Sequence, residues 1–202
     1  MKKILITSFI VLSLVGLVFA AQGNGASAND GTGAAYGDLD PGVGTEFKLL
    51  TGSYVNTNGQ KMQVREMDNN MIQLNVGGVS VDCDCELTQT TTQSRTQLKM
   101  SLSNGQKSEI KIMPDTASET ALQKLRLKNC DESNNCTIEL KEVAQGKELK
   151  AAYEIKAQRQ SKVLGMFQAE MQVRAQIDAE NGEVIRTKKP WWAFLATEPQ
   201  EE

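Results

Sequence analysis

The densest group of side chains that could do chemistry is the segment Asp82-Cys83-Asp84-Cys85-Glu86. In an extended strand alternate residues share a face, so the three carboxylates would form an acidic stripe with neighbours about 7 Å apart. Such a stripe supplies part of a calcium site if a neighbouring strand adds further oxygens, and its spacing also suits the paired carboxylates of a glycoside hydrolase. Because no sugar-binding aromatic residues lie nearby, we expect a solvated sheet face and assign no metal ligand and no catalytic residue.

The four cysteines indicate disulfide bonds, which are common in secreted chains. We predict a bridge between Cys130 and Cys136, which flank the polar loop 131–135. Cys83 and Cys85 would stand about 7 Å apart on one strand face, beyond the reach of a disulfide unless the strand kinks. The alternatives are crossed pairing between the two halves of the chain, a thiolate site for zinc or copper, or a Cys-x-Cys redox pair. The spacings do not match the usual zinc motifs.

The triplet Asn135-Cys136-Thr137 is an acceptor sequence for N-glycosylation. Asn135 is therefore a glycosylation candidate, although a bridge at Cys136 would hinder access to it.

An aromatic segment near the end of the sequence contains Trp191, Trp192, Phe194 and Leu195, including both tryptophans of the chain. We expect it to fold back onto the sheet, where each large side chain that it buries contributes about 1.5–3 kcal/mol. The alternative is an exposed segment that binds a partner or a membrane interface. The apolar patch 163–167 interrupts the alternation around it, which predicts a hairpin tip or a seat for the aromatic segment.

Composition excludes several classes of function. The chain of 202 residues has no histidine, which removes Ser-His-Asp and Cys-His nucleophile systems, His-ligated zinc and haem with a proximal histidine. Hydrophobic residues make up 40% of the sequence, enough for a folded core. The net charge is −3, which argues against nucleic acid and anionic membranes as partners.

The first 45 residues differ from the rest. Residues 1–20 begin with Met1-Lys2-Lys3, continue through an apolar run and reach small residues, which predicts a signal peptide cleaved near Ala20. Cleavage removes two lysines and changes the net charge from −3 to −5. Residues 21–45 are rich in glycine and predict a flexible linker. We therefore expect a secreted or extracytoplasmic protein without a stable membrane span after cleavage, either released or associated with the cell envelope. An uncleaved anchor is the alternative.

The remaining sequence predicts an α+β fold made mostly of antiparallel strands. Residues alternate between apolar and polar, and three Asn-Gly dipeptides mark tight turns at positions 58, 104 and 181. The strands are expected near 47–56, 60–67, 71–76, 79–88, 95–103, 107–113, 137–143, 149–163, 167–178 and 184–188. One helix is expected over about 117–127, where a capping box of Thr116 and Glu119 follows Pro114.

The order of elements from about 117 to 188 resembles the PepSY domain, a small module of peptidase propeptides and secreted proteins. The best local match is the segment 177–185, where Asp178 can cap a turn, Gly182 supplies a positive φ and Val184 begins the return strand. The strand at Tyr153 is similar to the central strand of that family. The resemblance implies a non-catalytic binding or inhibitory module and carries over no catalytic residues. From residue 102 to residue 198 the sequence also resembles uncharacterised secreted proteins of archaeal type, which implies no activity.

Together these observations predict a β-rich domain at 46–113, a PepSY-like α+β domain at 114–190 and an aromatic then acidic tail at 191–202. The expected function is that of a secreted binding or regulatory protein that modulates an extracytoplasmic protein such as a peptidase. It needs no cofactor and is not an enzyme. The alternatives are a structural component of the cell envelope and, ranked below it, a metal-binding protein that uses the acidic Cys-x-Cys strand.

Overall fold

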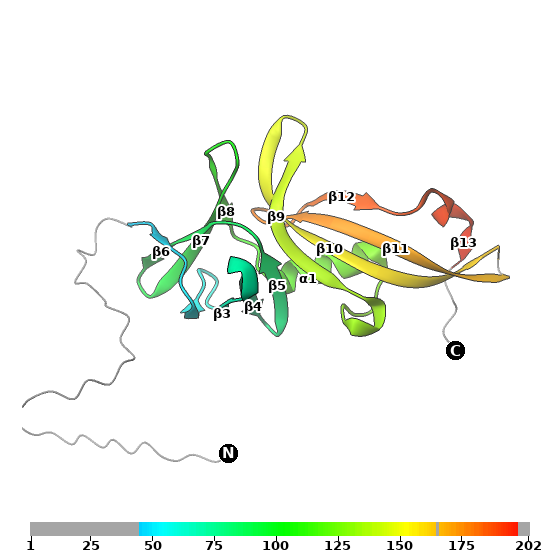
Figure 1. The fold of residues 1–202 in the computed structure, drawn as a ribbon, viewed down its shortest axis with the longest axis horizontal. Helices are drawn as coiled ribbons and strands as arrows, with labels where there is room; N and C mark the ends of the chain where they lie inside the picture. Colours follow the sequence, from blue (N-terminus) through cyan, green and yellow to red (C-terminus); the bar gives the residue numbers. More distant parts are fainter. Residues whose placement is uncertain (1–44, 165, 198–202) are drawn as a thin grey trace, which may run out of the picture. The chain divides into compact units, whose positions relative to one another are not determined.

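The computed structural model describes residues 45–164 and 166–197, which form two β-sheets and one α-helix (Figure 1). The predicted signal peptide, almost all of the predicted linker and the acidic end of the tail lie outside the described residues. Every strand pair but one is antiparallel, which confirms the expected class of a mostly antiparallel β fold with one helix. In the part of the chain that the structure describes, no helix has the length and apolar character needed to cross a membrane.

The smaller sheet has four strands in the order β1-β6-β7-β8. Their bounds are β1 Phe47–Lys48, β6 Leu87–Thr92, β7 Arg95–Ser101 and β8 Lys107–Ile110. The apolar side chains of β7 and β8 alternate with polar ones because successive residues point to opposite faces, and Leu98, Met100 and Ile110 are buried as expected. Only two residues, Gln93 and Ser94, separate β6 from β7, and the two strands pair as a hairpin.

The larger sheet runs in the order β12-β11-β10-β9-β5-β4-β3-β2, with β13 paired to β10. Its strands are β2 Gly52–Val55, β3 Lys61–Glu66, β4 Ile72–Val76, β5 Val79–Cys83, β9 Thr137–Gln145, β10 Glu148–Val163, β11 Phe167–Asp178, β12 Val184–Lys188 and β13 Ala196–Thr197. Short 3-10 helices occur at η1 Asp68–Asn70, η2 Glu132–Asn134 and η3 Trp191–Leu195. The parallel pair β5–β9 joins strands of the two predicted regions in this one sheet.

Two predicted strands are each divided in the structure. The expected strand 47–56 is interrupted around the buried Leu49, and the expected strand 79–88 ends at Cys83 and resumes at Leu87. In both cases the two pieces pair in different sheets. In the second case the apolar alternation continues through the break, because Val81 and Cys83 of β5 and Leu87 of β6 are all buried, and it therefore does not reveal where the chain changes sheets.

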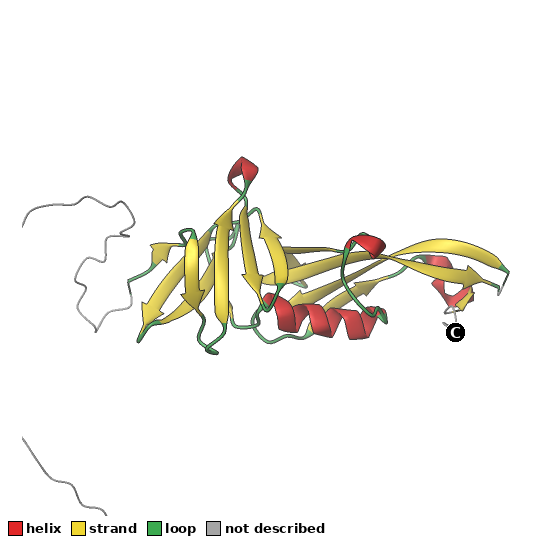
Figure 2. Ribbon diagram, turned by 90° about the horizontal axis from the view of Figure 1, so that it is seen from below, coloured by secondary structure: helices red, strands yellow, loops and turns green. Residues whose placement is uncertain are grey.

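Helix α1 spans Pro114–Leu125 and not 117–127 as the capping box suggested. Its N-cap is Met113, without a capping hydrogen bond from a side chain, and Pro114 occupies the first turn, where the missing N–H has no intrahelical role. Ala117, Ala121 and Leu125 are fully buried along one stripe. Figure 2 shows this helix lying along one side of the larger sheet, where it contacts β4, β5, β10, β11 and β12.

The hairpin of β10 and β11 is the longest element and extends well beyond the helix (Figure 1). Its register runs from Ala152 opposite Asp178 to Val163 opposite Phe167. Near the helix both strands are buried, whereas beyond Gln158 most side chains become half-buried or exposed. The fold therefore carries the hairpin turn away from the core.

The turn between β11 and β12 has the geometry that the sequence predicts. Asp178 accepts a hydrogen bond from the amide of Glu180 through its side chain (2.8 Å), and its carbonyl accepts one from the amide of Gly182 (2.9 Å). Gly182 has φ +77°, in the left-handed region that only glycine adopts at low cost.

Replacing Gly182 with alanine is expected to lower the free energy of unfolding by about 1 kcal/mol, because an L side chain is strained at this φ. A Cβ atom there would meet Ile112 side-chain atoms at 3.5 Å, an ordinary contact that adds no clash. Urea denaturation followed by circular dichroism measures the change. Glu183→Ala in the same turn is the control and should change stability by less than about 0.5 kcal/mol. Equal stabilities of the glycine variant and the wild type would contradict the prediction.

Candidate binding surface at the end of the long hairpin

The turn of the β10–β11 hairpin presents three large apolar side chains to solvent. Leu164, Met166 and Phe167 are 61%, 74% and 65% exposed. The amide of Met166 donates to the carbonyl of Val163 (3.1 Å), which closes the turn. The apolar patch 163–167 is therefore a hairpin tip, one of the two roles expected for it.

The aromatic segment folds back to this tip, so the patch has its second expected role as well. The short strand β13 pairs with β10, with Ala196 opposite Val163, and the amide of Leu164 donates to the carbonyl of Leu195 (3.1 Å). Trp192 and Ala193 pack against the core, as the packing interpretation predicts. This segment and the hairpin turn thus support each other through backbone hydrogen bonds.

The two segments together form a surface that we call the apolar tip. It consists of Leu164, Met166, Phe167, Trp191, Phe194 and Leu195. Trp191 and Phe194 are 80% and 76% exposed, the highest values among the large apolar side chains that the structure describes. Single exposed apolar residues are ordinary, but a group of six from two segments is typical of an interaction site. Of the four predicted partner-binding residues, three therefore face solvent and Trp192 faces the core.

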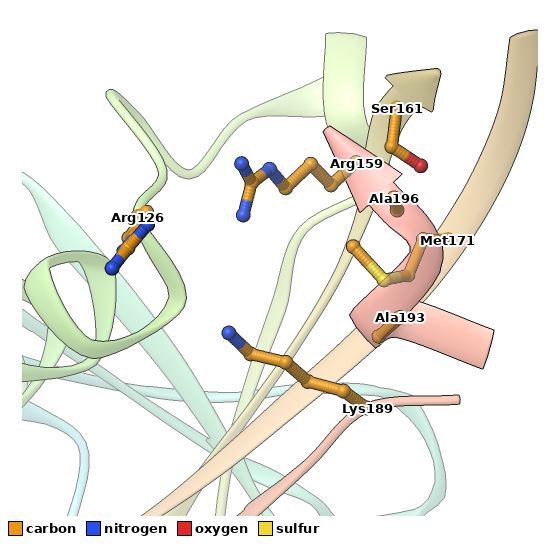
Figure 3. A pocket seen from close by; sticks show the side chains of 7 residues that line it. All are labelled: Arg126, Arg159, Ser161, Met171, Lys189, Ala193 and Ala196. Atoms are coloured by element: carbon orange, nitrogen blue, oxygen red, sulfur yellow. The ribbon is translucent and has the colours of Figure 1, made fainter. Parts of the chain in front are cut away.

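A basic cleft lies beside the base of the apolar tip (Figure 3). Its cavity of about 210 Å³ is lined by the cationic side chains of Arg126, Arg159 and Lys189, together with Ser161, Met171, Ala193 and Ala196. Arg126 follows helix α1, Arg159 is on β10, and Lys189 follows β12. Arg126 and Arg159 also line an adjoining cavity of about 420 Å³, to which Gln158, Gln160 and Asn134 contribute polar groups.

The bridge between Cys130 and Cys136 is present and closes the loop that borders the second cavity. Within this loop, hydrogen bonds from the Ser133 hydroxyl and backbone lower the pKa of Asp131 below its ordinary value. Asn135 is exposed, has φ +46° and donates a hydrogen bond to Gln158. Its glycosylation stays a prediction.

Cys83 and Cys85 are bonded to each other, so the crossed pairing is wrong. Their Cα atoms are 5.2 Å apart, closer than alternate residues of an extended strand, because β5 ends at Cys83 and the chain bends. Because of this bend the expected acidic stripe does not form: Asp84 and Glu86 lie outside the strand, and only Asp82 is on it. The carboxylate of Asp82 accepts a hydrogen bond from the side chain of Gln73 (2.9 Å). Among the described residues, no three His, Cys, Asp or Glu side chains are grouped so that they could hold a metal ion.

The basic cleft is the part of this surface that sequence reasoning missed. Its three cations lie on separate elements and share no motif, and they come together only because the hairpin, the helix end and the aromatic segment meet. The doublet Lys188-Lys189 is the one local signal that precedes the aromatic segment. A comparison of the chain with models of protein families and with curated proteins finds no match.

Proposed function

We propose that this chain is a secreted, non-catalytic binding protein with a PepSY-like C-terminal region, and that it recognises another extracytoplasmic protein through the apolar tip. The observation that carries the proposal is the exposure of six large apolar side chains on two segments, the hairpin turn and the aromatic segment, which are joined by the pairing of β10 with β13. The pairing of all four cysteines supports an oxidising compartment.

The chemistry of the tip favours a protein partner. Trp, Phe and Met are enriched at the centres of protein interfaces, where a few such anchors supply most of the binding energy. Lys188, which is exposed at the end of β12 and lies three residues before Trp191, adds a positive charge next to the aromatic segment. The surface therefore suits a partner that has an apolar groove edged by acidic residues. A backbone ladder holds the tip in place, so binding requires little ordering of it.

The test is quantitative capture with a matched pair of variants. The mature protein, immobilised through an N-terminal tag, is incubated with secreted and envelope fractions of the source cells, and bound proteins are quantified. The double variant Trp191→Ser/Phe194→Ser is expected to reduce capture of a specific protein at least about tenfold, because interface anchors contribute about 2 kcal/mol or more each. Leu50→Ser, at a residue that is 60% exposed elsewhere, should leave capture unchanged.

Two results would contradict the proposal. Equal capture by the tip variant and the wild type would show that the tip is not the interface. Sedimentation with vesicles of phosphatidylglycerol and phosphatidylcholine that is lost in the tip variant, without capture of a protein, would assign the tip to a membrane surface instead. Circular dichroism of each variant verifies that its fold is retained.

A further inference from the structure

We propose that Met166 is an oxidation site, at which a peroxide converts the apolar tip into a more polar surface and so weakens its binding. Met166 is 74% exposed in the turn between β10 and β11. The modification itself follows from this exposure and from the chemistry of the side chain. Its effect on binding rests on the proposed function, because only a tip that binds a partner can lose affinity on oxidation.

Met166 differs in exposure from the other methionines. The chain has eight, and the structure describes all but Met1. Four of them are at most 3% exposed, namely Met62, Met100, Met113 and Met171. Met71 is half-buried and Met67 is 40% exposed. Because a peroxide must reach the sulfur atom, we expect Met166 to react first among the described methionines and Met67 second.

The position of Met166 in the fold maintains its exposure. Its amide donates to the carbonyl of Val163 (3.1 Å), and the amide of Leu164 donates to the carbonyl of Leu195 (3.1 Å), so the backbone of the turn is held in place. The turn lies at the far end of the hairpin, beyond Lys156, where the pairing of β10 with β9 ends (Figure 1). An oxidant therefore reaches the side chain without any opening of the core.

Met171 provides an internal comparison on the same hairpin. It lies on β11, five residues after Met166, and its side chain lines the basic cleft (Figure 3). Although it borders this cavity, Met171 is only 3% exposed. Selective oxidation of Met166 therefore requires that the cleft stay closed to the oxidant, and reaction at both residues would report unfolding of the hairpin end.

The reaction with a peroxide is a two-electron oxygen transfer. The thioether sulfur of Met166 attacks one oxygen of hydrogen peroxide, and an S–O bond forms as the O–O bond breaks. The proton on the transferred oxygen passes to the departing hydroxide, which gives water. The sulfur is oxidised to a sulfoxide and the peroxide is reduced, so the step needs no further reactant. The sulfoxide is polar and accepts hydrogen bonds, whereas the thioether is apolar.

The sulfoxide affects binding because it forms among large apolar side chains. Phe167 directly follows Met166 and is 65% exposed, and Leu164 in the same turn is 61% exposed. A partner that covers these side chains also encloses the sulfoxide oxygen, and a buried acceptor without a donor weakens binding about tenfold. The coupling is reciprocal, so a bound partner should shield Met166 from the peroxide.

The first experiment maps oxidation in the absence of a partner. The mature protein with intact disulfides is treated with hydrogen peroxide at pH 7, and sulfoxide at each methionine is followed over time by mass spectrometry. Cleavage after glutamate places Met166 and Met171 in different peptides, because Glu170 lies between them. Met166 should react about twofold faster than Met67 and at least about tenfold faster than Met171, in the order of their exposed fractions. Equal rates at Met166 and Met171 would overturn the assignment of the oxidation site.

The second experiment repeats the capture assay with oxidised protein and with variants. Oxidised wild type and untreated Met166→Gln, which places a polar group at this position, should each capture about tenfold less partner. Met166→Leu cannot form the sulfoxide and should retain capture after treatment, whereas Met67→Leu should lose it as the wild type does. Full capture by wild type that is oxidised at Met166 would overturn the effect on binding. Absence of capture by the untreated protein would instead contradict the proposed function, and the first experiment would still decide the oxidation site.

Discussion

Replacing Tyr153 with alanine is expected to lower the free energy of unfolding by about 4 kcal/mol. The side chain is fully buried in the middle of β10, and its hydroxyl donates to the carbonyl of Ile112 just before the helix (2.7 Å). Truncating a buried aromatic residue to alanine costs about 3–5 kcal/mol through lost contacts and the cavity left behind. Since a domain has only about 5–15 kcal/mol of stability, this single change removes a large part of it.

Tyr153→Phe is the matched control, because it keeps the ring and removes only the hydroxyl. It should cost about 1–2 kcal/mol, mainly from the buried carbonyl of Ile112 that loses its donor. Both values are measured by urea unfolding followed by circular dichroism. Burial raises the pKa of Tyr153 above its ordinary value and the charge of Asp115 adds to this, so the hydroxyl stays a donor at neutral pH. A loss below about 1.5 kcal/mol for the alanine variant would show that Tyr153 does not anchor the sheet to the segment before the helix.

The later strands could be predicted closely from the sequence. The expected ranges 167–178 and 184–188 coincide with β11 and β12, because alternation is clean in both strands and Asp178 and Gly182 fix the turn between them. In this region the turn residues and the burial of one strand face favour the same strand bounds, so the alternation of apolar and polar residues is enough to predict them.

Elsewhere tertiary structure decides between local alternatives. The capping box at Thr116 and Glu119 competes with Pro114, and the helix begins at the proline because its fixed φ already suits a first turn. The bond between Cys83 and Cys85 bends a segment whose apolar alternation predicts one continuous strand. Neither the bend nor the change of sheet alters the alternation of apolar and polar residues in this segment, so neither could be predicted from it.

Of the candidate site, the aromatic residues of the apolar tip could be predicted from the sequence and the basic cleft could not. Large apolar residues such as Trp191 and Phe194 stand out by their type in a short segment, so composition identifies them. The cations of the basic cleft are ordinary residues at a helix end, on a strand and before a proline. They come together only through the fold, which single-chain patterns do not encode.

Glu154, on the face of β10 opposite to Tyr153, is a second residue whose environment could not be predicted from the sequence. Its place in the alternation predicts an outward, polar residue, yet it is only 1% exposed in the structure. Long polar side chains from neighbouring strands cover it. Lys141 forms an ion pair with it, Gln176 donates a hydrogen bond (2.7 Å), and Lys156 and Arg174 lie at 3.4 and 3.5 Å. Burial by itself would raise the pKa of Glu154, but the hydrogen bonds from Lys141 and Gln176 and the nearby cations lower it to about 2.

Replacing Glu154 with alanine is therefore expected to cost about 3 kcal/mol at pH 7. Breaking a buried ion pair costs about 3–5 kcal/mol, and the lower end applies because Lys141 is partly exposed and regains water. Glu148→Ala on the same strand removes an exposed carboxylate and should change stability by less than about 0.5 kcal/mol. Equal effects of the two substitutions would mean that the buried network around Glu154 does not stabilise the sheet.

The pH dependence of the same variant tests the charge itself. Because the pKa of Glu154 falls from 4.5 to about 2 on folding, its stabilising contribution is complete above pH 4.5 and is lost as the pH falls towards 2. The difference in unfolding free energy between the wild type and Glu154→Gln should therefore shrink steadily over this window. Glu139, whose pKa is also lowered, shares Lys141 and Lys156 with Glu154, so the same difference is also measured in a Glu139→Gln background, which removes the titration of Glu139. A difference that stays constant from pH 5 to pH 2 would show that Glu154 stabilises the sheet by packing and not by its charge.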